Sequence, residues 1–175
     1  MPFVIAILGF LAAAVIWSMR ARNAAHVATD LIDMANDARL AARRFGFRRN
    51  ANIHPVESIE TPAVAIATLA VAYLELDALP TREQQIALGR GLQTQLNLNL
   101  SDSEELVILG RWMMNECGGA EPAITRVARK LYKLDAGASF TPLMGVIKEI
   151  AAEGTALSQK QTSALADIKR AFRLS

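Results

Sequence analysis

The hydrophobic pattern of the chain begins with an uninterrupted apolar run. Residues 2–19 carry no charge, and the first charged residues after them are Arg20 and Arg22. A helix of about 20 apolar residues crosses a bilayer, and positive charge after the run places the following chain in the cytoplasm. A secretory signal would carry its basic residues before the apolar stretch. Residues 1–20 are therefore predicted to be a retained transmembrane anchor with its N-terminus outside; the alternative is a signal cleaved after residues 12–14.

The pattern then becomes that of an amphipathic helix. Residues 18–44 contain neither Pro nor Gly, and Gly46 predicts the end of the helix. We predict a helical stalk over residues 21–46 and a linker over residues 47–60. The apolar positions of the stalk recur at three- and four-residue spacing and form one stripe: Val27, Leu31, Met34, Ala38, Ala41 and Phe45.

Six further helices are predicted within residues 61–175. The first opens with Thr61 and Pro62, a favourable N-cap and first helical residue. It is apolar nearly all round, which predicts the buried centre of a bundle. Three later helix starts are predicted from residue pairs with the spacing of a capping box, namely Thr81 with Gln84, Ser101 with Glu104, and Ser158 with Gln161.

The same spacing identifies the residues expected in the core. Gly89 and Gly91 lie inside a predicted helix, where glycine costs about 1 kcal/mol relative to alanine, so we expect them where helices pack closely. The predicted core consists of Leu69, Leu74, Leu88, Leu92, Leu106, Leu109, Trp112, Ile124, Leu131, Ile147, Ile150, Leu165 and Ile168.

Composition agrees with an all-α fold. The chain is 52% hydrophobic and only 6% aromatic, alanine is frequent, and few stretches alternate apolar and polar residues as strands do. The predicted architecture is a single N-terminal transmembrane helix with a stalk, followed by a compact bundle of about six helices. The single cysteine, Cys117, excludes an internal disulfide and suits a reducing cytoplasm.

Charge divides the chain into a basic and a mildly acidic part. Residues 20–52 hold seven Arg and three Asp, whereas residues 53–175 have a net charge of −2. The basic cluster suits either anionic lipid headgroups or protein contact, with a partner or with the acidic face of this domain. A straight stalk would hold it about 30 Å from the membrane, beyond the Debye length of about 8 Å, which favours protein. Nucleic acid is not expected, because no binding motif is present. The cluster comprises Arg39, Arg43, Arg44, Arg48 and Arg49.

An internal repeat relates two stretches of the bundle. Residues 69–84 and 147–161 each contain an apolar helix, an acidic turn, a Leu and a hydroxyl cap before the next helix. Two duplicated helical hairpins would pack around one core. The pattern over residues 53–174 resembles the TerB-like family of tellurite-resistance proteins. The resemblance implies a compact all-α domain, and metal association or membrane stress response as in some members. By this resemblance, the candidate metal ligands are the acidic residues Glu75, Asp77, Glu83 and, more weakly, Glu153.

Catalytic signals are absent from the sequence. His26 and His54 have no evident acid–base partner, Cys117 has no base nearby, and no phosphate-binding glycine loop occurs. We therefore expect neither an enzyme nor a cofactor nor a small-molecule substrate. The leading hypothesis is a membrane-anchored, non-enzymatic adaptor or accessory subunit of a complex in a bacterial-type inner membrane, with a cytoplasmic helical domain. The alternative is a metal- or stress-responsive TerB-like module.

Overall fold

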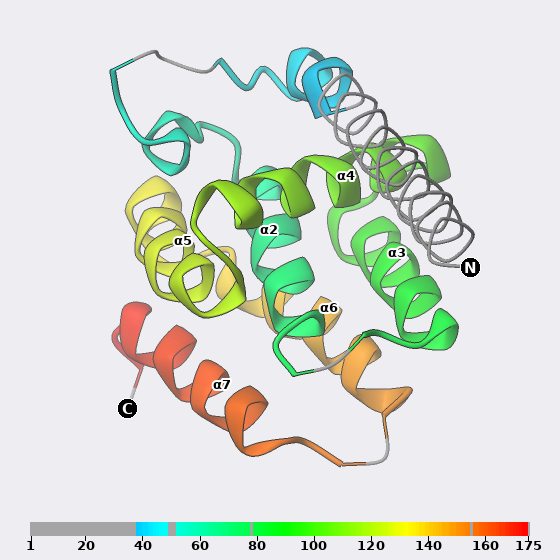
Figure 1. Ribbon diagram of the computed structural model, residues 1–175. Helices are drawn as coiled ribbons and strands as arrows, with labels where there is room; N and C mark the ends of the chain where they lie inside the picture. The colour runs from blue at the N-terminus through cyan, green and yellow to red at the C-terminus, as the bar shows by residue number, and fades with distance from the viewer. Residues whose placement is uncertain (1–37, 49–51, 78, 155, 175) are drawn as a thin grey trace, which may run out of the picture. The chain divides into compact units, whose positions relative to one another are not determined.

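The computed structural model describes residues 38–48, 52–77, 79–154 and 156–174 (Figure 1). The predicted anchor, most of the predicted stalk and Arg49 lie outside these residues. Within the described ranges, no helix is both long enough and apolar enough to cross a membrane.

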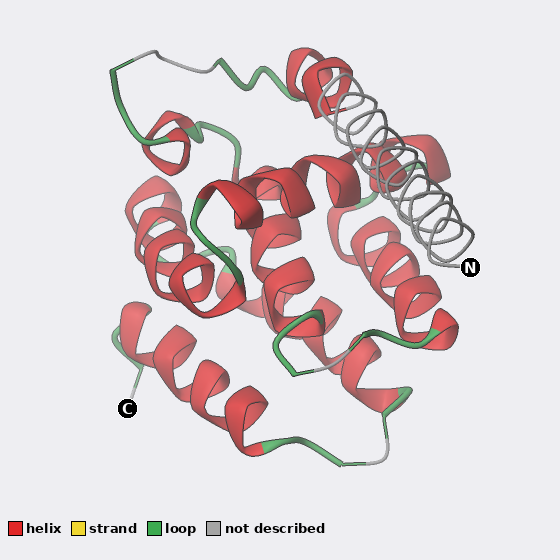
Figure 2. Cartoon of the chain, viewed as in Figure 1, coloured by secondary structure: helices red, strands yellow, loops and turns green. Residues whose placement is uncertain are grey.

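The described residues are all-helical, as the sequence predicts (Figure 2). Residues 38–44 form the end of a helix, and a short 3-10 helix, η1, follows at Pro55–Ser58. The predicted six-helix region is confirmed in its number of α-helices. They are α2 (Pro62–Leu74), α3 (Arg82–Leu96), α4 (Leu100–Glu116), α5 (Ala120–Asp135), α6 (Phe140–Ala152) and α7 (Gln159–Ala171).

Helix α2 is the centre of the bundle. Every residue from Val64 to Leu74 is buried, including Thr68, whose hydroxyl donates a 2.7 Å hydrogen bond to the Val64 carbonyl oxygen. Helices α3, α4, α5 and α6 pack around α2, and α7 packs on the outer side of α5 (Figure 1). Complete burial of a Val, Leu or Ile side chain contributes about 1.5–3 kcal/mol, so the apolar surface of α2 supplies much of the driving force for assembly.

The helix caps follow local sequence in two of the three predicted cases. Thr81 with Gln84 and Ser158 with Gln161 form complete, reciprocal capping boxes. The predicted pair Ser101 and Glu104 does not cap α4. Asn99 caps it instead, because its side-chain oxygen accepts a 2.8 Å hydrogen bond from the Asp102 N–H and starts the helix two residues earlier.

Most residues of the predicted core are buried, but the prediction of a separate linker is wrong. Of the thirteen predicted core residues, only Trp112 and Leu165 are partly exposed. The described residues of the predicted linker, 47–48 and 52–60, are not a spacer, because Phe47, Val56 and Ile59 are buried in the core. The His54 side chain accepts the N–H of Val56 and thereby caps η1. This segment is part of the domain.

Of the four glycines inside the described helices, two lie against the backbone of a neighbouring helix. A Cβ on Gly110 of α4 would lie 3.0 Å from the Ala67 carbonyl carbon in α2, and one on Gly91 of α3 would lie 3.2 Å from the Val146 Cα in α6. The expectation for Gly89 is wrong, since nothing lies within 4 Å of the Cβ position there. Gly110 therefore sets how closely α4 approaches the central helix.

Gly110→Ala is expected to destabilise the domain by about 1–3 kcal/mol, because the added methyl meets backbone that cannot move aside easily. Gly89→Ala, the matched control in open space, is expected to stabilise it by up to about 1 kcal/mol through helix propensity. Urea unfolding followed by circular dichroism measures both. Equal effects of the two substitutions would contradict the close approach of α4 and α2.

Leu109→Ala is expected to cost about 2–5 kcal/mol, since Leu109 is fully buried on the inner face of α4 and its removal leaves a cavity. Leu100→Ala, in the first turn of the same helix, changes a side chain that is 60% exposed and should alter stability by less than about 0.5 kcal/mol. Similar losses for both variants would show that the assigned faces of α4 are wrong.

Candidate functional site

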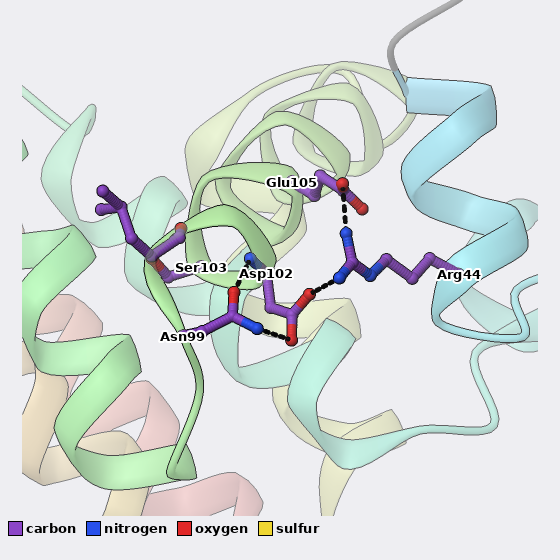
Figure 3. A network of polar contacts seen from close by, with 6 residues as sticks. Arg44, Asn99, Asp102, Ser103 and Glu105 are labelled. Carbon is purple, nitrogen blue, oxygen red and sulfur yellow. Dashed lines mark hydrogen bonds and ion pairs between the residues drawn. The ribbon is translucent and has the colours of Figure 1, made fainter.

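The first candidate site is the contact between residues 38–48 and α4. Arg44 reaches the first turns of α4 and forms two ion pairs, 2.6 Å from Nη2 to the Asp102 carboxylate and 2.7 Å from Nη1 to the Glu105 carboxylate (Figure 3). Asn99 orients Asp102, because its side-chain amide donates a 2.9 Å hydrogen bond to the other carboxylate oxygen. One guanidinium therefore bridges two acids that α4 already holds in place.

Apolar contacts complete this attachment. Ala38 and Ala41 are buried, and the Phe47 ring packs edge-on against Trp112 of α4 with ring centroids 5.8 Å apart. The Thr61 hydroxyl donates a 3.1 Å hydrogen bond to the Phe45 carbonyl oxygen. The end of the predicted stalk and the two residues after it, residues 38–48, are thus fixed on the domain by both packing and charge.

The remaining arginines of the predicted basic cluster behave differently from Arg44. Arg39, Arg43 and Arg48 are exposed and have no ion-pair partner within the described part of the chain. Arg49 lies outside it. Of the four described arginines, Arg44 alone meets the acidic face of this domain, which leaves three positive charges facing solvent on the attached segment.

The acidic residues predicted as metal ligands are not brought into one site. Glu75 pairs with Arg111 at 2.7 Å, and Asp77 accepts a hydrogen bond from the Ser158 hydroxyl. Glu153 pairs with Arg90 at 3.3 Å, and Glu83 is exposed in the first turn of α3. Among the described residues, no three His, Cys, Asp or Glu side chains are grouped so that they could hold a metal ion.

Three of these carboxylates, those of Glu75, Asp77 and Glu153, instead connect helices. The hydrogen bond from Ser158 to Asp77 joins the turn after α2 to the start of α7, which are the two turns of the sequence repeat. Arg90 of α3 binds both Glu149 and Glu153 at the end of α6, at 3.1 and 3.3 Å. Two elements that are distant in sequence are held together at each of these contacts.

A basic groove along α5 was not predicted from the sequence. It has a volume of about 560 Å³, and its other lining residues include Glu57 next to η1 and Cys117 at the end of α4. The sequence spacing of its four cations could have predicted it, because residues at positions i, i+3, i+4 and i+7 lie on one face of a helix. The cations are Arg126, Arg129, Lys130 and Lys133.

A second groove separates the start of α5 from α7. Its volume is about 640 Å³, with Leu76, Ile124 and Ala164 on its apolar side and Glu121 and Lys160 on its polar side. These two charged residues pair with each other at 3.4 Å. Thr125, Ser163 and Asp167 also line this groove, whereas no histidine or cysteine does.

Burial changes two titratable groups. Burial raises the pKa of the Cys117 thiol above its ordinary value, the Arg126 charge opposes this rise, and the Glu116 carboxylate adds to it. Burial also raises the pKa of Tyr73, with a smaller contribution from Asp77. Both groups are therefore neutral near pH 7, and a neutral thiol is a poor nucleophile.

Comparison with known proteins identifies no family. No family model, no curated protein and no solved structure matches the chain.

Arg44→Ala is expected to speed amide hydrogen exchange in residues 38–48 while lowering global stability by no more than about 1 kcal/mol, since the ion pairs are partly exposed. Arg43→Ala is the matched control, because Arg43 is next to Arg44 in sequence, is exposed and has no ion pair among the described residues. Exchange measured by mass spectrometry tests this. Equal changes for the two variants would contradict the role of Arg44 in attachment.

The alkylation rate of Cys117 by iodoacetamide should reach half its maximum at a higher pH in the folded chain than in the chain unfolded in urea, because only the thiolate reacts. Arg126→Gln removes the charge that opposes the rise in the Cys117 pKa, so its midpoint should move higher still. Lys148→Gln, a change on α6, should leave the midpoint unchanged. An unchanged midpoint for Arg126→Gln would show that the two side chains do not interact, and a lower one would contradict the sign of the effect.

Proposed function

We propose that this protein is a membrane-anchored, non-enzymatic adaptor, an accessory subunit of a protein complex in a bacterial-type inner membrane. Its helical domain would lie on the cytoplasmic side and present surfaces for a partner protein. The anchor itself rests on the sequence, in which residues 2–19 are uncharged and the first positive charges follow them.

The observation that carries the proposal is the attachment of residues 38–48 to the bundle. This segment follows the apolar run by about 20 residues, and its Ala41, Arg44 and Phe47 are bound to the domain by burial, ion pairs and a ring contact. A domain attached in this way cannot swing freely about residue 48. Such an attachment keeps the exposed arginines of residues 38–48 at fixed places on the domain, which suits a partner-binding surface.

The placement of reactive side chains also supports a non-enzymatic role. His54 is used as a helix cap, and Cys117 lies beside cations and an acid but not beside a histidine in its groove. The carboxylates Glu75, Asp77 and Glu153 are engaged in contacts between helices. This use of the acids favours the adaptor over the metal-responsive module.

A TerB-like origin and an internal duplication remain proposals. The two complete capping boxes, at Thr81 and Ser158, support them, and so does the contact between the two repeated turns. The packing of the two hairpins differs, because α3 packs on α6 whereas α7 packs on α5.

The proposed partner contacts involve Arg39, Arg43 and Arg48, the exposed arginines of the attached segment. The full chain carrying all three charge reversals to Glu should lose its complex when purified in mild detergent, while its binding to anionic liposomes is unchanged. The matched control is a triple reversal of exposed cations elsewhere, at Arg82, Lys148 and Lys169. This control should retain the complex.

Two results would contradict the proposal. Recovery of the wild-type chain alone at several expression levels would remove the accessory-subunit role. Loss of liposome binding in the Arg39, Arg43 and Arg48 variant, with the complex intact, would assign these arginines to lipid. Protease treatment of right-side-out spheroplasts tests the orientation separately, since a cytoplasmic domain should stay intact.

A further inference from the structure

Helix α5 carries positive charge that the described part of the domain does not neutralise. Arg126, Arg129 and Lys133 are exposed and have no ion-pair partner among the described residues. Lys130 donates a 2.8 Å hydrogen bond to the backbone carbonyl oxygen of Glu57, which leaves its charge uncompensated. Glu57 is the one acid among the residues that line the groove, against four cations.

This excess of positive charge is unlike other parts of the domain, where arginines form ion pairs. Arg44, Arg90 and Arg111 each bind one or two carboxylates across helices. The negative end of the helix dipole accounts for a cation such as Lys133 in the last turn of α5. It does not account for Arg126 and Arg129, which lie nearer the middle of the helix.

We propose that the α5 groove binds an acidic, extended peptide segment of a partner protein. The proposal names the partner chemistry for the adaptor function proposed above and rests on that function. The cations from Arg126 to Lys133 span about 10 Å along the helix at 1.5 Å per residue. An extended peptide covers that length in about three residues, and carboxylates at alternate positions lie on one side of it.

The shape and lining of the groove favour a peptide over a membrane surface. Binding to a bilayer commonly combines cations with exposed apolar side chains that enter the interface. The seven large apolar side chains that are most exposed in the described residues, from Leu40 to Leu174, do not line this groove. No aromatic side chain lines it either, so it lacks the stacking platform of single-stranded nucleic-acid sites.

The test uses the full chain in detergent and a fluorescent peptide in which Glu and Ser alternate, with three Glu residues. Fluorescence anisotropy should detect binding of this peptide and none of the version with Gln in place of Glu. Arg126→Glu with Arg129→Glu should weaken binding about tenfold, because each reversal removes an attraction and adds a repulsion. The matched control, Arg82→Glu with Lys148→Glu, makes the same change in net charge and should alter binding less than about twofold.

Cys117 gives a readout local to the groove. It lines the groove and is the one cysteine of the chain, so bound Glu peptide should slow its alkylation and the Gln peptide should not. Arg126→Gln with Arg129→Gln provides a milder variant if charge reversal impairs folding, which thermal melting monitors.

Three outcomes would overturn the proposal. These are no binding of the Glu peptide, equal weakening by the groove variant and the matched control, and binding that leaves Cys117 unprotected. Binding to vesicles that contain phosphatidylglycerol is measured as well. If the wild type does not bind the peptide and the groove variant loses the vesicle binding of the wild type, the groove is a lipid site. Failure of the peptide with the membrane complex intact rejects the groove proposal alone, whereas peptide binding by a chain recovered without partners rejects the adaptor function.

Discussion

The central constraint on this domain is the need to cover α2 on every side. A helix that is apolar all round has no face that can be left in water, so its burial requires several neighbours at once. Helices α3 to α6 provide this cover, and α7 extends the bundle by packing on α5. Gly110 allows α4 to come within backbone contact of Ala67. The arrangement of the other helices follows from the composition of one.

The second organising feature is the segment that joins the bundle to the rest of the chain. Phe47, Val56 and Ile59 are buried in the same core as the side chains of the six α-helices. Arg44 adds a polar contact at the start of α4, where Asp102 is also favoured by the positive end of the helix dipole. Its energetic contribution is modest, since the pair is partly exposed, but its geometry fixes where the segment lies.

Charge is distributed in a way that separates structural from available residues. Most acids named by the sequence pattern connect helices through arginines or hydroxyls, and in the described part of the chain they are not grouped as metal ligands. The cations of α5 and the exposed arginines of residues 38–48 have no such partners among the described residues. This residual charge is the basis of the proposed interaction with an acidic partner.

Local signals in the sequence determined the helices, because apolar spacing and the capping boxes at Thr81 and Ser158 act within a few residues. Leu109 and Ile147 could be assigned to the core for the same reason. Tertiary structure decided the rest. Asn99, and not Ser101, caps α4, and side chains of the predicted linker are buried in the core. The α5 groove is lined by Glu57 and Cys117 as well as by α5 itself, and Glu57 is distant from α5 in sequence. Those outcomes depend on contacts between residues far apart in the chain. A local sequence pattern does not reveal the free energies of such contacts.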